Sequence, residues 1–194
     1  AAQTIYLKGV LTVRDVRLIY KKQGRAKYIS HLDMNRLFLR LVKKAALPIW
    51  HTEGFNPHPY VTFAVPLSLG FESEYDIFDI KLTDDNYDTR LVTDAFRAVA
   101  PDGLEFIESF EPQMKYGDIY SADFVITFFD VDSVFSNRLA EFCQSKPINV
   151  QKKRKNGKID TIDISEKILS VNVENTADGV VLRLSLPAGS NENV

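Results

Sequence analysis

Hydrophobic and polar positions alternate along the chain in a way that predicts strands and helices in turn. Apolar or alternating runs predict four strands, at 16–20, 61–65, 75–82 and 104–107. Apolar residues at helical spacing follow Ser30 and occur again over 87–100, and both segments are predicted helices. The order strand, helix, strand, strand, helix, strand is that of a ferredoxin-like unit, which we expect over 14–112.

The remaining residues repeat the beginning of this order. A strand over 122–129 and a helix over 131–144 are followed by two predicted hairpins. Their strands lie at 148–155 and 158–164 around Asn156-Gly157, and at 169–173 and 180–186 around Asp178-Gly179. We therefore predict an α+β fold of two ferredoxin-like units in tandem. In this division 1–13 is a tail or a remnant of expression, 113–121 is a linker, and 122–194 is a second unit truncated before its final helix.

The first predicted helix is well defined at its start and has two different faces. Ser30-His31-Leu32-Asp33 fits a capping box, with Ser30 as the N-cap. The apolar stripe of the helix predicts a buried face. Its opposite face is basic and carries Arg36, Arg40, Lys43 and Lys44.

Composition narrows the class of protein. The chain has 194 residues, 45% of them hydrophobic and 26% charged, which excludes a disordered or collagen-like chain. Its apolar stretches are short, so we expect no membrane span and a cytoplasmic location. The single cysteine, Cys143, excludes an internal disulfide, and we expect it to be a buried, inert thiol.

The net charge of −2 hides a strong segregation of charge along the sequence. Residues 14–60 hold ten Lys and Arg against three Asp and Glu, whereas 71–111 hold three against twelve. A second basic block follows at Lys152, Lys153, Arg154 and Lys155. This pattern is typical of a cationic face for an anionic partner, of docking between opposite fields, or of solvated faces without a partner.

The three histidines, His31, His51 and His58, fall at the predicted helix start and around the loop at 50–60. If they converge, two of them with Asp33 or Glu53 form a metal site, although no zincin-type spacing supports one. His31 is also a candidate general base for RNA cleavage. The candidate catalytic residues are therefore His31, Asp33 and His58, but we do not assign either role to them. We expect no metal and no cofactor.

Several motifs together identify a resemblance to a known family. They are Tyr20-x-Lys22-x-Gly24, Tyr28-Ile29-Ser30-His31-Leu32-Asp33, Gly54-Phe55-Asn56-Pro57-His58-Pro59, Phe63-Ala64-Val65-Pro66-Leu67-Ser68-Leu69-Gly70 and Glu72-Ser73-Glu74. In order and spacing they resemble the radical-SAM-linked domain of unknown function, a bacterial domain that stands alone or is fused to a radical-SAM protein. The resemblance implies a radical-SAM protein as partner and a role in modifying RNA or the translation machinery. Tyr60 is a departure from the family, in which Lys or Arg is common at this position.

The sequence thus predicts a non-catalytic accessory module that recognises RNA or a ribonucleoprotein. Its expected phosphate contacts are Arg36, Arg40, Lys43, Lys44, Lys152, Lys153, Arg154 and Lys155. Its expected stacking faces are Tyr20, Tyr28, Phe55 and Tyr60, beside a loop site of Gly54, Asn56, Pro57 and His58. Two alternatives stay open: an RNA-processing or metal-dependent enzyme that uses His31, and a protein-docking module that uses the acidic segment 72–111.

Overall fold

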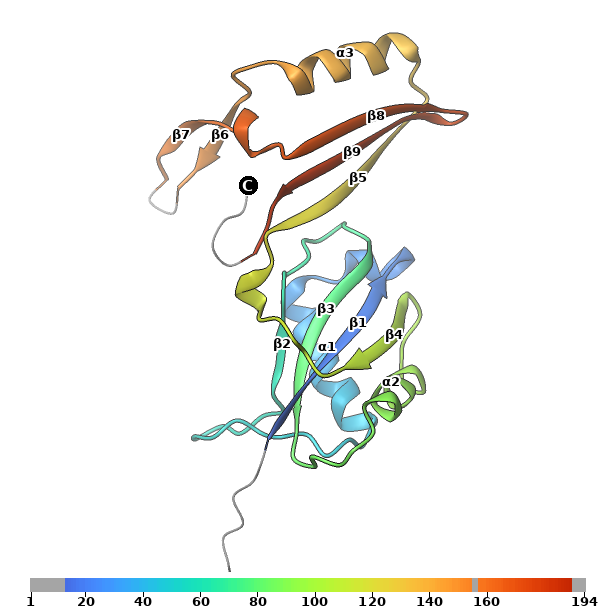
Figure 1. Cartoon of the computed structure of the whole chain (residues 1–194), viewed down its shortest axis with the longest axis vertical. Helices are drawn as coiled ribbons and strands as arrows, with labels where there is room; N and C mark the ends of the chain where they lie inside the picture. Colours follow the sequence, from blue (N-terminus) through green and yellow to red (C-terminus); the bar gives the residue numbers. More distant parts are fainter. Residues whose placement is uncertain (1–12, 155–156, 190–194) are drawn as a thin grey trace, which may run out of the picture. The chain divides into compact units, whose positions relative to one another are not determined.

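The computed structural model describes residues 13–154 and 157–189 of the chain. It is a mixed α and β protein in which every strand pair is antiparallel. The chain divides into two compact units, with the boundary between Met114 and Lys115 (Figure 1). In the described part no helix has the length and hydropathy needed to cross a membrane.

Unit 1 follows the predicted order of elements. Its four strands are β1 (Arg14–Lys22), β2 (Val61–Phe63), β3 (Ser73–Leu82) and β4 (Leu104–Phe110). Its helices are η1 (Gly24–Tyr28), α1 (His31–Lys44) and α2 (Thr89–Arg97). The strands pair in the order β2-β3-β1-β4, so β1 has a neighbour on each side. Strand β3 is the other inner strand, and a larger share of the side chains is buried on β1 than on β3.

Helix α1 begins where the capping motif predicts. Ser30 has an extended backbone, and its hydroxyl accepts from the Asp33 backbone N–H at 3.2 Å. The same hydroxyl donates to the Asp33 carboxylate at 2.8 Å. Ser30 therefore satisfies one of the N–H groups left unpaired at the helix start.

An aromatic cluster joins α1 to the sheet. The ring of Phe38 lies 4.6 Å from Phe78, 5.0 Å from Phe63 and 5.1 Å from Tyr20, measured between ring centroids. Most of these pairs are tilted or edge-on, which is the arrangement aromatic rings favour. Because Phe38 is fully buried and touches three strands, it fixes the helix against the sheet.

Two predicted elements are shorter than expected, each for a local reason. The strand over 61–65 ends at Phe63, because Pro66 restricts the residue before it and lacks an N–H for a ladder. The helix over 87–100 begins only at Thr89, where the Asp88 side chain accepts from the Arg90 N–H and caps it. Its last regular residue is Arg97, four residues before Pro101.

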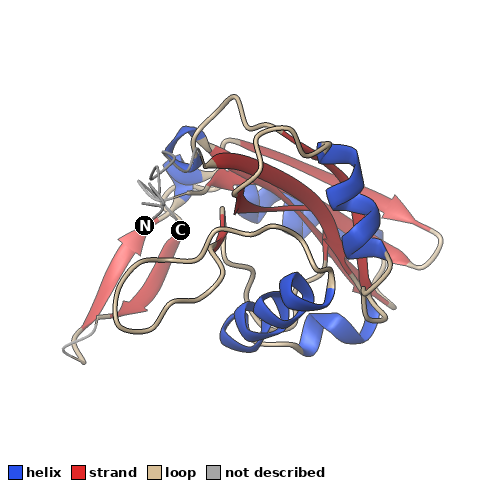
Figure 2. Ribbon diagram, turned by 90° about the horizontal axis from the view of Figure 1, so that it is seen from below, coloured by secondary structure: helices blue, strands red, loops and turns tan. Residues whose placement is uncertain are grey.

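Unit 2 contains β5 (Ser121–Phe129), α3 (Ser133–Gln144), β6 (Asn149–Lys153), β7 (Ile159–Asp163), β8 (Ser170–Thr176) and β9 (Gly179–Pro187), with short 3-10 helices η2 (Tyr116–Asp118) and η3 (Ser165–Lys167). Strands β5, β9 and β8 form one sheet in that order, while β6 and β7 pair only with each other. The pairing of β6 with β7 and of β8 with β9 confirms both predicted hairpins. The β6–β7 ribbon stands apart from the β5-β9-β8 sheet (Figure 2).

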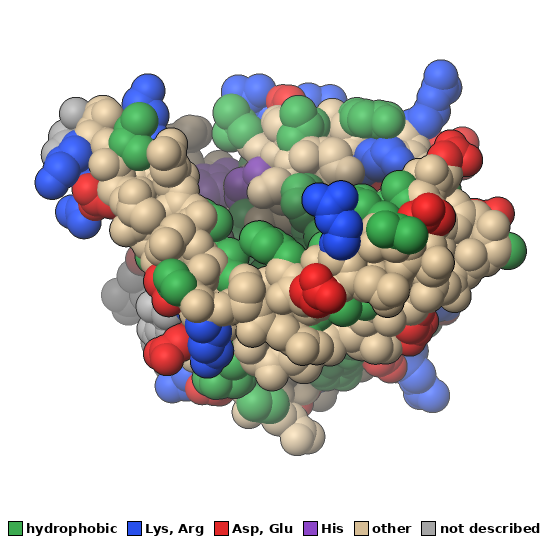
Figure 3. All heavy atoms as spheres, turned by 90° about the horizontal axis from the view of Figure 1, so that it is seen from above, with side chains coloured by type: hydrophobic (Ala, Val, Ile, Leu, Met, Phe, Trp, Pro, Cys, Tyr) green, Lys and Arg blue, Asp and Glu red, His purple; other side chains and the backbone are tan. Residues whose placement is uncertain are grey.

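The described part of unit 2 has one α-helix and no counterpart of α2 and β4. Phe128 of β5 lies 5.0 Å from Phe135 of α3, which marks the side of the sheet that the helix covers. Ile126 belongs to the same side of β5 and is nevertheless exposed, as are Val134 and Phe142 on α3. Hydrophobic side chains are accordingly visible from the side on which α3 lies (Figure 3).

We predict that Phe38→Ala destabilises unit 1 by about 3–5 kcal/mol, because it empties a buried site in contact with three strands. Urea denaturation followed by circular dichroism measures the change. Leu32→Ala, on the exposed side of the same helix, is the matched control and should shift the free energy of unfolding by no more than about 0.5 kcal/mol. Equal losses in the two variants would contradict the packing described.

Candidate nucleic-acid interface

Much of the charge that is segregated along the sequence is paired inside unit 1. Arg17 of β1 donates two hydrogen bonds to the Asp79 carboxylate of β3, at 2.9 and 3.0 Å, and both side chains are buried. Lys21 lies 3.3 Å from Glu105 of β4, and Lys27 lies 3.1 Å from Glu72. The basic first segment and the acidic later segment therefore neutralise each other where their strands meet.

Helix α1 keeps a basic surface that this pairing does not consume. We call Arg36, Arg40, Lys43 and Lys44 the α1 stripe; all four side chains are exposed, as predicted. Arg36 forms a 3.0 Å ion pair with Asp33, one turn back. Within the described residues no carboxylate lies within ion-pair distance of Arg40, Lys43 or Lys44. These three cations of α1 are therefore open to solvent or to a ligand.

The β6–β7 ribbon is less basic than its sequence suggests. The carboxylate of Asp160 forms an ion pair with Arg154 and lies 3.8 Å from the Lys158 ammonium. Asp160 also stands opposite Lys152 in the strand register. Lys153 is exposed. Lys155, the fourth residue of the predicted block, lies outside the described residues.

The loop at 50–60 is a narrow hairpin held by its own backbone. His51 and Pro59 form an isolated bridge, Thr52 N–H donates to the His58 carbonyl at 2.9 Å, and Tyr60 N–H donates to the Trp50 carbonyl at 3.0 Å. We call residues 50–60 the 50–60 hairpin. Its base is tied to the sheet, because Trp50 N–H donates to the Lys81 carbonyl of β3 at 2.7 Å.

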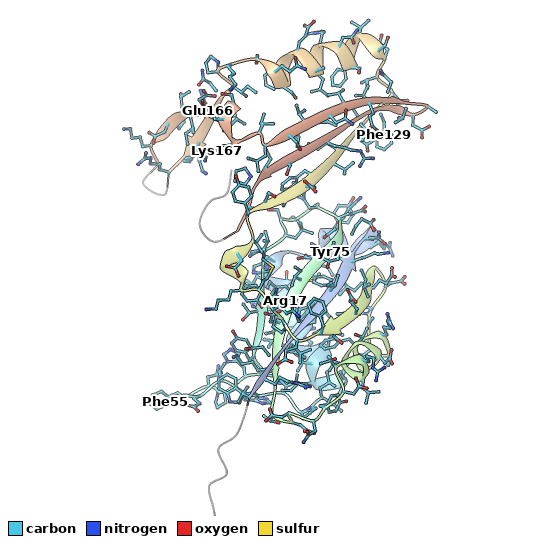
Figure 4. The ribbon with its side chains drawn as sticks, viewed as in Figure 1. Arg17, Phe55, Tyr75, Phe129, Glu166 and Lys167 are labelled. Carbon is cyan, nitrogen blue, oxygen red and sulfur yellow. The ribbon has the colours of Figure 1, made fainter. Side chains whose placement is uncertain are left out.

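Side chains fix the tip of the 50–60 hairpin as well. The ring nitrogen Nδ1 of His58 lies 3.1 Å from both the Thr52 hydroxyl and the Asn56 carbonyl. Gly54 has a φ of +121°, a conformation that glycine adopts more easily than other residues. The Phe55 ring projects from this tip and is fully exposed (Figure 4). Gly54, Asn56 and His58, which the sequence singles out, thus shape the loop that presents Phe55.

The three histidines have separate surroundings. His31 begins α1, and its ring lies edge-on 5.5 Å from Phe63. His51 and His58 follow the other end of this 14-residue helix and contact their own hairpin. No group of three His, Cys, Asp or Glu side chains is placed to hold a metal ion among the described residues. Asp33, the acidic residue among the candidate catalytic residues, belongs to the helix cap, and its hydrogen bonds with Ser30 and Arg36 hold the pKa of its carboxyl below the usual value.

The predicted stacking residues differ in accessibility. Tyr28 is exposed, and Tyr60 lies 5.9 Å from Trp50 with the Lys81 ammonium 5.1 Å from its ring centroid. Tyr20 is buried in the aromatic cluster under α1, so it offers no face to a base. The alternation of Val16, Leu18 and Tyr20 along β1 is the signal that places Tyr20 inside.

A buried polar cluster below the start of α1 was not foreseen from the sequence. The Tyr20 hydroxyl donates to the Asp76 carboxylate at 2.9 Å. Lys22, with 1% of its surface exposed, donates from Nζ to the Ile29 carbonyl at 3.2 Å. Burial raises the pKa of Asp76 and lowers the pKa of Lys22, while attraction between the two charges opposes both shifts. Lys22 occupies an inward position in the alternation of β1, and this position is the sequence signal for its burial.

Cys143 of α3 is half-buried and unpaired. Burial raises the pKa of its thiol, which makes the thiolate scarce at neutral pH. It lines a shallow hollow of about 370 Å³ together with Lys146, Ser165 and Glu166. Nothing in this hollow activates the sulfur as a nucleophile.

The fold and these surfaces define a class: a two-unit α and β protein with antiparallel sheets, a basic helix and two projecting hairpins. The chain belongs to a bacterial family described as an uncharacterized protein conserved in bacteria (DUF2344), whose model matches residues 15–194. This membership confirms the expected bacterial domain of unknown function. No curated protein matches the chain.

The buried carboxyl of Asp76 makes a prediction about pH. Because its pKa is raised above 3.8 in the folded state, the folded state binds more protons than the unfolded state just above pH 3.8. The contribution of Asp76 to the free energy of unfolding therefore falls as pH rises through that window. Urea denaturation of the wild type and of Asp76→Asn between pH 4 and 8 should show this fall in the difference between the two curves.

Tyr20→Phe is the companion variant. It leaves Asp76 without the hydroxyl donor and should destabilise the fold by about 1–3 kcal/mol.

A stability difference between wild type and Asp76→Asn that does not change with pH would contradict the pH prediction. It would show that Asp76 titrates alike in the folded and unfolded chain, and would contradict its buried, hydrogen-bonded position.

Proposed function

We propose that this protein is a non-catalytic accessory module that recognises RNA, or RNA within a ribonucleoprotein, for a radical-SAM enzyme. The observation that supports RNA recognition is the exposed, basic α1 stripe. Arg40, Lys43 and Lys44 are exposed and lack an ion-pair partner among the described residues, in a unit that pairs much of its other charge internally. Such cations gain free energy by displacing counterions from a phosphate backbone.

The strand orders support a ferredoxin-like frame in both units. Unit 1 has the order β2-β3-β1-β4 with one helix after its first strand and one after its third. In unit 2 the first, last and second strands of the three-stranded sheet lie in the order β5-β9-β8, which matches β1-β3-β2. Each unit also inserts a hairpin between its first helix and its next sheet strand (Figure 1). We infer that the units are a complete and a partial version of one design.

The radical-SAM part of the proposal rests on the motif resemblance. A radical-SAM cluster needs three cysteine ligands, and this chain has one cysteine, so the cluster belongs to the partner in this scheme. The chain would hold the substrate while the partner performs the chemistry.

Two observations favour this proposal over its alternatives. Among the described residues no hydrogen bond orients the His31 ring, which a general base needs. Glu72, Asp79 and Glu105 of the acidic segment are paired with basic side chains of the same unit, so they are already neutralised as a docking field.

The test is RNA binding by the purified chain across a salt series, for the wild type and for Arg40→Glu with Lys43→Glu. We expect the variant to bind more weakly at every salt concentration. Loss of two phosphate contacts should also flatten the plot of log K against log salt by roughly 1.4.

The control is Arg25→Glu with Arg90→Glu, two exposed basic residues of unit 1 outside α1. It changes net charge by the same amount and should retain most of the affinity. Equal losses in the two variants would mean that only net charge matters and would contradict a site on α1. Absence of RNA binding by the wild type at low salt, with salt-sensitive binding to the radical-SAM protein, would establish the docking alternative instead.

A further inference from the structure

The 50–60 hairpin presents an aromatic ring to solvent with nothing packed against it. Phe55 is exposed over its whole surface at the far end of the hairpin (Figure 4). Phe55 lies five positions after Trp50 at the base, so at about 3.3 Å per residue the hairpin reaches roughly 16 Å from its base. A phenylalanine in this place contributes nothing to the core of unit 1.

Hydrogen bonds hold the backbone of the hairpin that carries this ring. Backbone hydrogen bonds at Thr52 and Tyr60 close the two strands, and the His58 ring ties Thr52 to the Asn56 carbonyl. Pro57 and Pro59 restrict the returning strand further. A tip that is ordered before binding loses little conformational entropy when it engages a ligand.

Charge indicates which ligand the hairpin meets. The α1 stripe ends at Lys43 and Lys44, and only five residues lie between Lys44 and Trp50, so the phosphate contacts lead along the helix toward the hairpin. Residues 50–60 include no Lys or Arg, and their one acidic residue is Glu53, two positions before Phe55. A phosphate is therefore favoured along α1 and disfavoured at the tip, while an uncharged aromatic base suits the tip.

We propose that Phe55 stacks on an unpaired base of RNA whose phosphates lie on the α1 stripe. This inference rests on the proposed function and narrows it: the substrate is single-stranded at the point where the hairpin contacts it. An aromatic ring can stack on any base whose face is free, whereas paired bases in a duplex hide their faces. The hairpin thus discriminates single strands from duplexes, and the α1 stripe supplies affinity for both.

The experiment compares Phe55→Ala with the wild type on two probes, an unstructured 20-nucleotide RNA and the same strand annealed to its complement. Loss of one stacked base should weaken binding to the single strand about 5- to 150-fold. The salt dependence should stay unchanged, since no phosphate contact is lost. Binding to the duplex should not change.

Two further variants sharpen the result. Phe55→Trp should retain affinity, and Phe71→Ala, an exposed phenylalanine outside the hairpin, should bind like the wild type. The fluorescence of a single strand that carries 2-aminopurine should be quenched when the wild type binds it, and not when Phe55→Ala does. Because Phe55 is fully exposed, its replacement does not threaten folding.

The outcomes separate this inference from the function on which it rests. If the wild type binds RNA and Phe55→Ala binds the single strand equally well, the stacking role is wrong while the RNA proposal stands. If Phe55→Ala loses affinity for single strand and duplex alike, the discrimination is wrong. If the wild type binds neither probe and Phe55→Ala loses a protein partner, then the tip is a protein contact and both proposals fall.

Discussion

Strand β1 carries basic side chains into the middle of unit 1, and this is possible because β3 brings acidic side chains close to them. Arg17 is paired with Asp79 inside the fold, and Lys22 lies enclosed near Asp76. An unpaired charge in such a place would cost several kcal/mol. The antiparallel register of β1 with β3 is therefore an electrostatic requirement as well as a hydrogen-bonding one.

This pairing decides which charges remain for function. The sequence shows a basic first part and an acidic second part, which on its own fits two oppositely charged surfaces. In the fold, several of those charges neutralise each other between neighbouring elements, while the α1 stripe stays exposed and three of its four cations have no ion pair among the described residues. Glu72, Asp79 and Glu105 are held in ion pairs with basic side chains of the same unit. Among the described residues no such ion pair involves Arg40, Lys43 or Lys44.

Periodicity was sufficient to predict the order of elements, the Ser30 cap and both hairpins of unit 2, because local spacing and turn residues determine these features. Helical periodicity also predicted which face of α1 is exposed, for the same reason. Periodicity did not reveal Lys22 and Asp76, since a charged residue in an inward position contradicts the usual hydrophobic pattern until its partner is known. The separation of the histidines depends on where α1 places its two ends, which is a tertiary feature that residue types alone do not encode. The exposure of Phe55 agrees with the expected stacking face, but the hairpin that presents it, closed by Thr52 and His58, was not predicted.

The central claim is that α1 and the 50–60 hairpin form one surface for RNA. Ultraviolet cross-linking of the wild-type chain to an unstructured RNA, followed by mass spectrometry of the cross-linked peptides, tests it most directly. The account predicts cross-links on the peptide that contains Phe55, with protection of Lys43 and Lys44 from chemical modification in the complex. Cross-links confined to α3 or to the β5-β9-β8 sheet, with Phe55 unmodified, would contradict it.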